Sequence, residues 1–547
     1  MNSVLAPRGA LRPRPPESGG AQLGVAPSKE ERAPEVLTSK GLGLLLHLHE
    51  RFEARRLALL AARAERQRAF DAGELPSFLP ASTDVRNAEW RIEPVPGDLQ
   101  DRRVEIAGPP ERSFLVQALG APVQTCLADF EDACSPTWSN VLRGQINLAD
   151  AVRGRLVPTE RIAGSLRGNR PVTLMVRPRG WHLPEKHVRA GAAPVSAALF
   201  DFSLYLAGNH ELLIRKGSGP YFYLPKLEGQ EEARLWNDVF LAAQEWLGLP
   251  RGTIRATVLI ETVPAAFEMD EILFELREHA AGLSTGRWDY IFSAIKKFRH
   301  RNDWVLPDRS ALGMDRECLH AYEELLISTC HRRGAHAIGG MAAQMSIHSE
   351  PAANAAAMAA VRADKLREAR AGLDGSWIGY PVLAPIARQA FDEVRAQAGA
   401  GRIVAASGDT SPRIGPAELL RVPEGAVTEA GVRLNIRVGV QYLEGWLRGI
   451  GNVPLYHQFE DAATAEICRA QLWQWLHRGT RTAEGWVLTP DRFHSLLSDE
   501  LEAIHREVGS QRTLAGVFPS ATRLFAGLVT DDRFEEFMTL PAYDLLS

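Results

Sequence analysis

The sequence predicts an α/β fold, a TIM or (β/α)8 barrel, with a helical domain before it and a helical domain after it. Between about residue 119 and residue 395, short apolar runs recur, and longer segments with helical spacing of apolar residues separate them. The runs do not alternate between apolar and polar residues, which is typical of strands buried on both faces of a parallel sheet. A doubly wound parallel sheet is the main competing arrangement.

Seven strands are predicted, and the position of the eighth stays open. They are Val123–Asp129, Val172–Val176, Tyr221–Pro225, Ala256–Ile260, Trp288–Phe292, His336–Gly340 and Ser376–Tyr380. Charged residues lie at or just after the ends of the first four, namely Asp129, Glu131, Asp132, Arg177, Lys226 and Glu261. In a barrel the carboxyl ends of the strands share one rim, where catalytic groups converge.

The segments on either side of the barrel differ in composition. Residues 1–34 hold six prolines, which would break the amphipathic helix of a transit peptide, so we predict a disordered tail. Residues 35–118 are predicted as a mainly helical domain, because apolar residues recur at helical spacing from Glu35 to about Leu75. Residues 119–395 form the predicted barrel. After a linker at 399–415, residues 405–547 form the predicted C-terminal helical domain.

Composition excludes several classes of function. The net charge is −4, so no basic excess indicates a nucleic acid or an anionic membrane as partner. No apolar run approaches the roughly 18 residues of a membrane-spanning helix. Five cysteines without a CxxC pair argue against a disulfide framework and fit a reducing compartment, so we expect a cytoplasmic protein. The oligomeric state stays open, a monomer included.

Glu261 and Asp289 are the first candidates for chemistry. Asp289 lies inside the apolar run "WDYIF", where a carboxylate is costly unless something pairs with it or coordinates it. Two carboxylates on one rim can hold Mg2+, can divide acid and base roles, or can form salt bridges with nearby arginines. The spacing alone leaves these three alternatives open.

Arg177 and Asp461 are the next candidates. A guanidinium on the rim suits a planar anion or a developing oxyanion, although Arg177 could also be a salt-bridging surface residue. Asp461 opens a helical segment, where an acid is favoured as a helix cap. To act as a base, Asp461 would have to reach over the mouth of the barrel from the C-terminal domain.

Several long segments, in the same order, resemble motifs of the malate synthase family, in particular its shorter A-type isoform. They are "DFEDACSPTWSNVLRGQINL" (129–148), "RPRGWHLPEKH" (177–187), "GPYFYLPKLE" (219–228), "IETVPAAFEMDEILFELREHAAGLSTGRWDYIFS" (260–293), "GGMAAQM" (339–345), "DKLREARAGLDGSWIGYP" (364–381) and "EDAATAEICRAQLWQW" (460–475). The resemblance covers about 119–547 and is weaker at 35–118. It implies a TIM barrel whose active site is covered by a C-terminal helical plug.

The resemblance also implies an activity and a set of site residues. The reaction is the Mg2+-dependent condensation of acetyl-CoA with glyoxylate and water to give malate and CoA, a step of the glyoxylate cycle. The implied metal ligands are Glu261 and Asp289, the catalytic arginine is Arg177 and the catalytic base is Asp461. The remaining implied residues are Gly286, Arg287 and Trp288, which face the glyoxylate carboxylate, Pro381, which contacts CoA, and Asp129, Glu131 and Asp132, which lie beside the metal.

Two departures from the family pattern concern the substrates. The family usually has Asn-Cys where this chain has Ser284-Thr285, and a histidine where it has Tyr380. The first departure leaves the implied metal ligand Asp289 unchanged, and the second lies on the side of the site that binds CoA in the family. A related Mg2+-dependent lyase that cleaves malyl-CoA without hydrolysing it, or a non-catalytic CoA-binding paralogue, are the competing functions.

Overall fold

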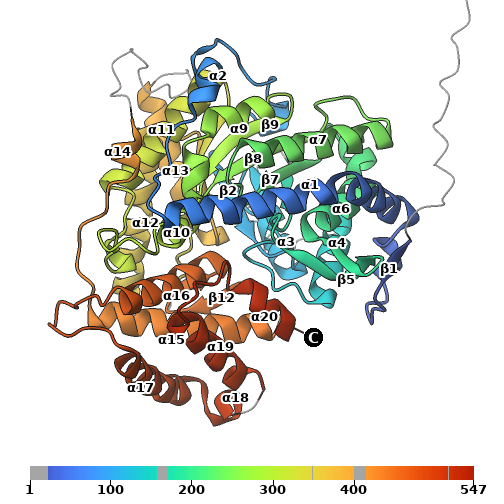
Figure 1. The fold of residues 1–547 in the computed structure, drawn as a ribbon. Coiled ribbons are helices and arrows are strands. Elements are labelled where there is room, and N and C mark those ends of the chain that lie inside the picture. The colour runs from blue at the N-terminus through green and yellow to red at the C-terminus, as the bar shows by residue number, and fades with distance from the viewer. Residues whose placement is uncertain (1–21, 157–170, 348, 399–413, 515, 547) are drawn as a thin grey trace, which may run out of the picture.

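The centre of the protein is a closed barrel of eight parallel strands, which confirms the predicted fold class (Figure 1). The computed structural model describes residues 22–156, 171–347, 349–398, 414–514 and 516–546. The barrel strands, in their order around it, are β10 (His336–Ala342), β11 (Gly375–Ile378), β2 (Val104–Gly108), β3 (Thr125–Asp129), β4 (Thr173–Arg177), β7 (Tyr221–Leu224), β8 (Arg255–Ile260) and β9 (Ala280–Thr285). Apart from the last three residues of β10, every residue of these strands is buried, which explains why their sequences do not alternate.

The structure corrects one predicted strand and supplies the missing one. The run "WDYIF" is not a strand but belongs to helix α10 (Arg287–Lys297), and the strand before it is β9. A short apolar run cannot by itself distinguish a buried strand from a buried helix. The eighth strand is β2, which lies within the range 35–118 predicted as helical and pairs with β11 and β3. The barrel therefore begins before residue 119.

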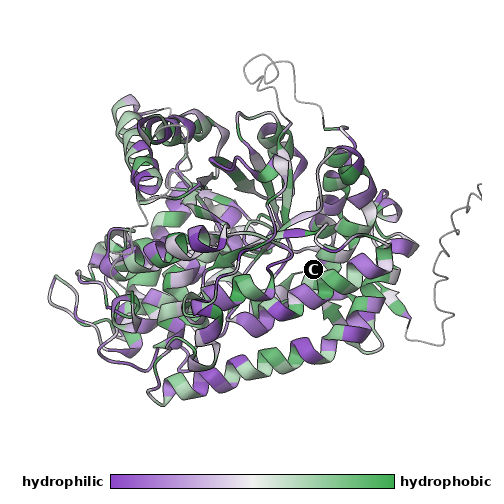
Figure 2. Ribbon diagram, turned by 90° about the horizontal axis from the view of Figure 1, so that it is seen from above, coloured by the Kyte–Doolittle hydropathy of each residue, from purple (hydrophilic) through white to green (hydrophobic). Residues whose placement is uncertain are grey.

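Helices cover the outside of the barrel. They are α3 (Arg112–Leu119), α4 (Trp138–Val152), α6 (Ala197–Arg215), α7 (Gln230–Leu247), α8 (Val263–Ala266), α9 (Met269–Glu275), α10, α11 (Glu317–Arg333), α12 (Pro351–Ala371) and α13 (Ala384–Ala398). Figure 2 shows hydrophilic and hydrophobic residues mixed along these helices, as expected for helices with one buried face. Among the described residues, no helix is both long and apolar enough to cross a membrane.

The N-terminal part of the chain is attached to the barrel wall. Helix α1 (Ser39–Asp71) packs on α6 and α7, and the short helix α2 (Thr83–Asn87) packs on α9. Strand β1 (Leu23–Val25) pairs antiparallel with β5 (Pro184–Ala190), which in turn pairs with β6 (Ala193–Ser196). The predicted tail is therefore wrong for residues 22–34, because β5 offers an edge for β1 to pair with. Residues 1–21 lie outside the described part.

The C-terminal part forms a helical domain with its own apolar core. Its helices are α15 (Glu429–Leu447), α16 (Ala462–His477), α17 (Pro490–Val508), α18 (Ser510–Leu514), α19 (Phe518–Thr530) and α20 (Thr539–Leu545), while the short helix α14 (Pro416–Leu419) packs on α11 of the barrel. A hairpin of β12 (Val453–Leu455) and β13 (Gln458–Glu460) leads into α16. Figure 1 shows these orange and red helices gathered on one side of the barrel, with α16 against α10. The predicted linker falls mainly on residues 399–413, outside the described part.

Candidate active site at the rim of the barrel

The predicted site residues converge on the carboxyl rim of the barrel. Glu261 follows β8 and Asp289 lies in the first turn of α10, directly after β9. Asp129 ends β3, with Glu131 and Asp132 in the loop that follows, and Arg177 ends β4. All of these side chains are buried. The arrangement agrees with the general rule that catalytic groups of such barrels lie at this rim.

Three carboxylates form a cluster with the geometry of a cation site. Asp132, Glu261 and Asp289 each place one oxygen within 4.8 Å of the others. Asp289 Oδ1 is buried and accepts no hydrogen bond among the described residues, although the ammonium of Lys226 lies 3.3 Å away as an ion-pair partner. A buried acceptor of this kind is costly unless an ion or a donor satisfies it. The cluster therefore fits Mg2+, which prefers carboxylate oxygens together with waters and substrate oxygens.

Lys226, which the sequence predicts at this rim without assigning it a role, reaches into the same cluster. Its ammonium lies 2.6 Å from Glu131 Oε2, 2.8 Å from Asp132 Oδ1 and 3.3 Å from Asp289 Oδ1. Its backbone N–H donates to Glu261 Oε1 at 2.6 Å. With a φ of 53°, Lys226 is one of three non-glycine residues in the described part with a positive φ. Such a backbone costs roughly 1–3 kcal/mol and persists only where the surroundings hold it.

Arg177 is held in place by two acids and an indole. Its Nε and Nη2 donate to the two oxygens of Asp129 at 2.6 and 2.5 Å, and Nη1 lies 3.0 Å from Asp132 Oδ2. The guanidinium carbon lies 5.5 Å from the ring centroid of Trp377. A guanidinium has five N–H donors, so these three contacts leave two for a substrate oxygen. Asp129 thus orients Arg177 and the loop of Glu131, rather than lying in the carboxylate cluster.

Asp461 is both a helix cap and a neighbour of the cluster. Its Oδ1 accepts a hydrogen bond from the amide of Thr464 at 3.1 Å, which caps α16. The amide of Ala462 donates to the backbone carbonyl of Asp132 at 3.2 Å, and the hydroxyl of Tyr442 also points to that carbonyl. These bonds attach the start of α16 to the acidic loop of the barrel. The capping interpretation and the catalytic one are therefore compatible.

Burial and mutual repulsion raise the pKa values of several of these acids. Burial, followed by the charge of Asp132, raises the pKa of Asp461 to about 7. Burial also raises the pKa of Glu261, and it holds the pKa of Asp289 well above its usual range although Lys226 opposes this. Asp132 differs, because Lys226 and Arg177 outweigh its burial and lower its pKa. An added positive charge at this site would stabilise the ionised forms of these carboxylates.

A charge count leads to the same conclusion. Six carboxylates meet at the rim, those of Asp129, Glu131, Asp132, Glu261, Asp289 and Asp461. The basic side chains that form ion pairs with them in the described part are Arg177 and Lys226. A divalent cation would offset much of the remaining negative charge, which burial makes costly.

The loop between β9 and α10 brings backbone close to the cluster. A Cβ atom at Gly286 would lie 2.7 Å from Cβ and 2.8 Å from Oε2 of Glu261, so only glycine fits without a shift. The amide of Gly286 donates to the hydroxyl of Tyr322 at 3.1 Å. The next amides, of Arg287 and Trp288, are in the first turn of α10, where a helix has no acceptors of its own for its N–H groups. The structure thus favours these two amides over that of Gly286 as anion donors.

Pro381 lies at the rim after β11, and a groove lies at the segments after the next two strands, β2 and β3. Pro381 follows β11, the neighbour of β2, and the ring of Tyr380 packs 5.8 Å from that of Phe459 on the hairpin. A groove of about 840 Å3 opens between the segments that follow β2 and β3. Its lining includes Arg112 and Arg143. The rim therefore has an acidic side, formed by residues at the ends of β3, β8 and β9, and an open side at β11 and β2, where none of these acids lies.

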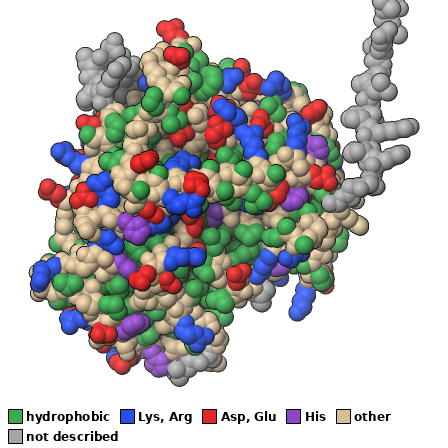
Figure 3. Space-filling model, viewed as in Figure 1, with side chains coloured by type: hydrophobic (Ala, Val, Ile, Leu, Met, Phe, Trp, Pro, Cys, Tyr) green, Lys and Arg blue, Asp and Glu red, His purple; other side chains and the backbone are tan. Residues whose placement is uncertain are grey.

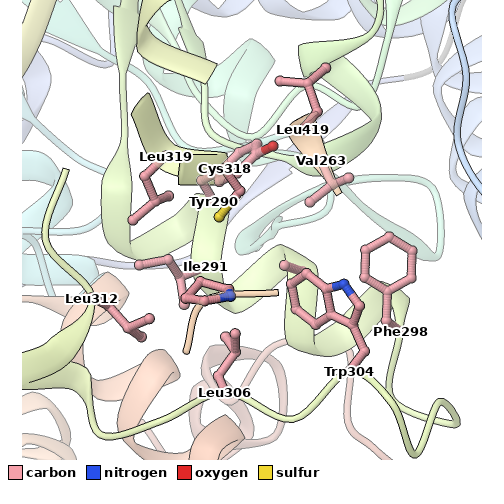
Figure 4. Close-up of a pocket in the computed structure, with 12 residues that line it drawn as sticks. Val263, Tyr290, Ile291, Phe298, Trp304, Leu306, Leu312, Cys318, Leu319 and Leu419 are labelled. Carbon is pink, nitrogen blue, oxygen red and sulfur yellow. The ribbon is translucent and has the colours of Figure 1, made fainter. Parts of the chain in front are cut away.

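Two other features of the molecule are not binding sites of this kind. Figure 4 shows Tyr290, Phe298 and Trp304 around a cavity of only about 10 Å3, which is apolar and belongs to the packing of α10. On the face shown in Figure 3, acidic and basic side chains are interspersed, without a large patch of one sign.

Comparisons with known proteins identify the family of this chain. The family model described as "Malate synthase, TIM barrel domain" matches residues 173–411, "Malate synthase, C-terminal" matches 426–546, and "Malate synthase, N-terminal domain" matches 25–84. The malate synthase of Myxococcus xanthus is 52% identical over 513 residues, which is 94% of each chain. Malate synthase A of Escherichia coli is 46% identical over 520 residues, covering 94% of this chain and 97% of that protein. The chain therefore belongs to the malate synthase family, enzymes that condense acetyl-CoA with glyoxylate.

Proposed function

We propose that this chain condenses acetyl-CoA with glyoxylate at a Mg2+ site and hydrolyses the resulting thioester to malate and CoA. The observation that carries the proposal is the convergence of Asp132, Glu261 and Asp289 with Arg177 and Asp461 at one rim. We also propose that the protein acts in the cytoplasm, where its five buried cysteines would stay reduced.

Glu261 and Asp289 would hold the metal, with Asp132 as a third carboxylate beside them. When bound, Mg2+ supplies a Lewis acid that polarises the aldehyde of glyoxylate. The N-terminus of α10 faces the same region, so the amides of Arg287 and Trp288 would bind the glyoxylate carboxylate.

Asp461 and Arg177 would carry the proton transfer. A carboxylate oxygen of Asp461 would remove a proton from the acetyl methyl group, so that the C–H electrons form the C=C bond of the enolate and the carbonyl π electrons move onto the thioester carbonyl oxygen. The two N–H donors of Arg177 that its acidic partners leave free would stabilise this oxygen, whose charge is present mainly in the transition state and the enolate. The enolate carbon would then attack the aldehyde carbon, whose oxygen takes up a proton to become the hydroxyl of malyl-CoA, and water would cleave the thioester to give the malate carboxylate and the CoA thiol.

The CoA moiety would lie on the open side of the rim. Pro381 follows β11, and the groove near β2 and β3 offers about 840 Å3 with Arg112 and Arg143 in its wall. Guanidinium groups suit the phosphates of CoA. This placement leads the acetyl group from the open side toward Asp461, while glyoxylate occupies the acidic side.

The pH dependence should report the raised pKa of Asp461. Only the ionised carboxylate can accept the methyl proton, so kcat/KM should fall as the pH drops below about 7. A cation near Asp132 favours the ionised form of Asp461, so the acidic limb of the kcat/KM profile should shift to lower pH as Mg2+ approaches saturation. Profiles measured at several Mg2+ concentrations check both points. A limb at the ordinary aspartate value of about 4 that does not move with Mg2+ would contradict this role.

A thiol-release assay tests the proposed function directly. With acetyl-CoA, glyoxylate and Mg2+ together, we expect free CoA and malate in equal amounts, and neither when any one component is omitted. Loss of the acetyl-CoA thioester without free CoA would instead select the malyl-CoA-type lyase. The complete absence of turnover, with CoA still bound, would select the non-catalytic paralogue.

A further inference from the structure

Lys226 is the one residue that contacts all three carboxylates of the cluster through hydrogen bonds or ion pairs in the described part of the chain. Its ammonium lies 2.8 Å from Asp132 Oδ1 and 3.3 Å from Asp289 Oδ1, and its backbone amide donates to Glu261 Oε1. The side chain is almost fully buried, at 5% exposure. A charged amine buried this deeply is stable only because its partners surround it.

Three carboxylates surround the ammonium of this lysine, those of Glu131 at 2.6 Å, Asp132 at 2.8 Å and Asp289 at 3.3 Å. The left-handed backbone at this position turns the residue so that amide and ammonium act on the same cluster. The backbone amide of Lys226 donates a hydrogen bond to Glu261, which couples the backbone conformation to that carboxylate. The ammonium of the side chain neutralises the carboxylates of Asp132 and Asp289.

We propose that Lys226 is an internal counter-ion that holds the carboxylate cluster together without metal and competes with Mg2+ for it, which sets the affinity for the cation. The proposal rests on the proposed metal site. The ammonium and a divalent cation would compete for the same two carboxylates, those of Asp132 and Asp289. A unit positive charge at hydrogen-bond distance from these ligands repels a bound cation and reduces the charge that attracts it.

The proposal predicts two effects of opposite sign in one variant. Without the ammonium, the carboxylates repel one another in the metal-free protein, so Lys226→Met should lower its Tm. The same repulsion is relieved when Mg2+ binds, so Mg2+ should bind at least about tenfold more tightly than in the wild type. Because the cation binds the folded state, the rise in Tm on adding Mg2+ should also be larger than in the wild type.

The experiment is calorimetric titration with Mg2+ alone, together with thermal unfolding in EDTA and in Mg2+. It compares the wild type with Lys226→Met and with Lys226→Gln. The glutamine variant is the alternative if the methionine variant does not fold, because its amide can still donate to Glu131 and Asp132. Lys365→Met is the matched control. Lys365 is a buried lysine paired with Glu368 and hydrogen-bonded to Ser376. Its replacement by methionine should therefore lower the stability of the protein and leave its Mg2+ affinity unchanged.

The outcomes separate this inference from the metal site on which it rests. Tighter Mg2+ binding by a Lys226 variant, with wild-type affinity in Lys365→Met, supports the counter-ion role. Wild-type protein that binds Mg2+ while both Lys226 variants bind it equally or more weakly overturns that role and leaves the metal site standing. Wild-type protein that binds no Mg2+ overturns the metal site and this inference with it.

Discussion

Replacing Asp461 by asparagine is expected to reduce the rate of CoA release about 1000-fold while Mg2+ and glyoxylate still bind. A positioned general base typically contributes between about 100-fold and 10,000-fold, and an amide cannot take its place. The fold should survive, because the asparagine side chain still offers an oxygen to the amide of Thr464 and caps α16. Initial rates of CoA release and calorimetric binding of glyoxylate in Mg2+ measure the two halves of this prediction.

The matched control for this change is Asp308→Asn. Asp308 is a buried acid that accepts hydrogen bonds from the amide and the hydroxyl of Thr428, at the start of the C-terminal domain. It makes no contact with the cluster in the described part of the chain, so its variant should lose some stability and keep its rate. Malate formation by Asp461→Asn at near wild-type rates would rule Asp461 out as the base.

Replacing Asp289 by alanine is expected to weaken Mg2+-dependent glyoxylate binding by at least about 100-fold. Loss of an outer hydrogen-bond partner of a metal ligand already costs about 10-fold to 100-fold in affinity, and here the change removes a ligand itself. Alanine is a good helix former, so the first turn of α10 should remain. Calorimetric titration with glyoxylate, with Mg2+ and with EDTA, separates metal-dependent from metal-independent binding.

Asp270→Ala is a suitable comparison, because Asp270 is also a buried acid in the first turn of a barrel helix, α9. Its partners are Arg332 and Arg333 rather than the cluster, so its variant should bind glyoxylate like the wild type. If Asp289→Ala binds glyoxylate in Mg2+ as tightly as the wild type does, Asp289 is not a metal ligand.

Asp289 illustrates how far sequence reasoning could go. The unusual acid in the run "WDYIF" and its place after Glu261 were visible in the sequence, but the run was interpreted as a strand. In the structure it begins α10, and Gly286 ends the loop that brings the helix start against Glu261. Tyr290, Ile291 and Phe292 are buried as predicted and Trp288 is half-buried, but the run is too short for its pattern to distinguish a strand from a helix.

Local signals in the sequence determined the alternation of strands and helices, the charged residues after the strands and the family motifs. Tertiary structure alone decided that Asp461 meets Asp132, that Lys226 contacts three carboxylates, and that burial raises the pKa of Asp461 to about 7. The physical reason is that periodicity and motifs depend on neighbours along the chain. Burial and charge repulsion instead depend on groups that only the closed barrel and the docked C-terminal domain bring together.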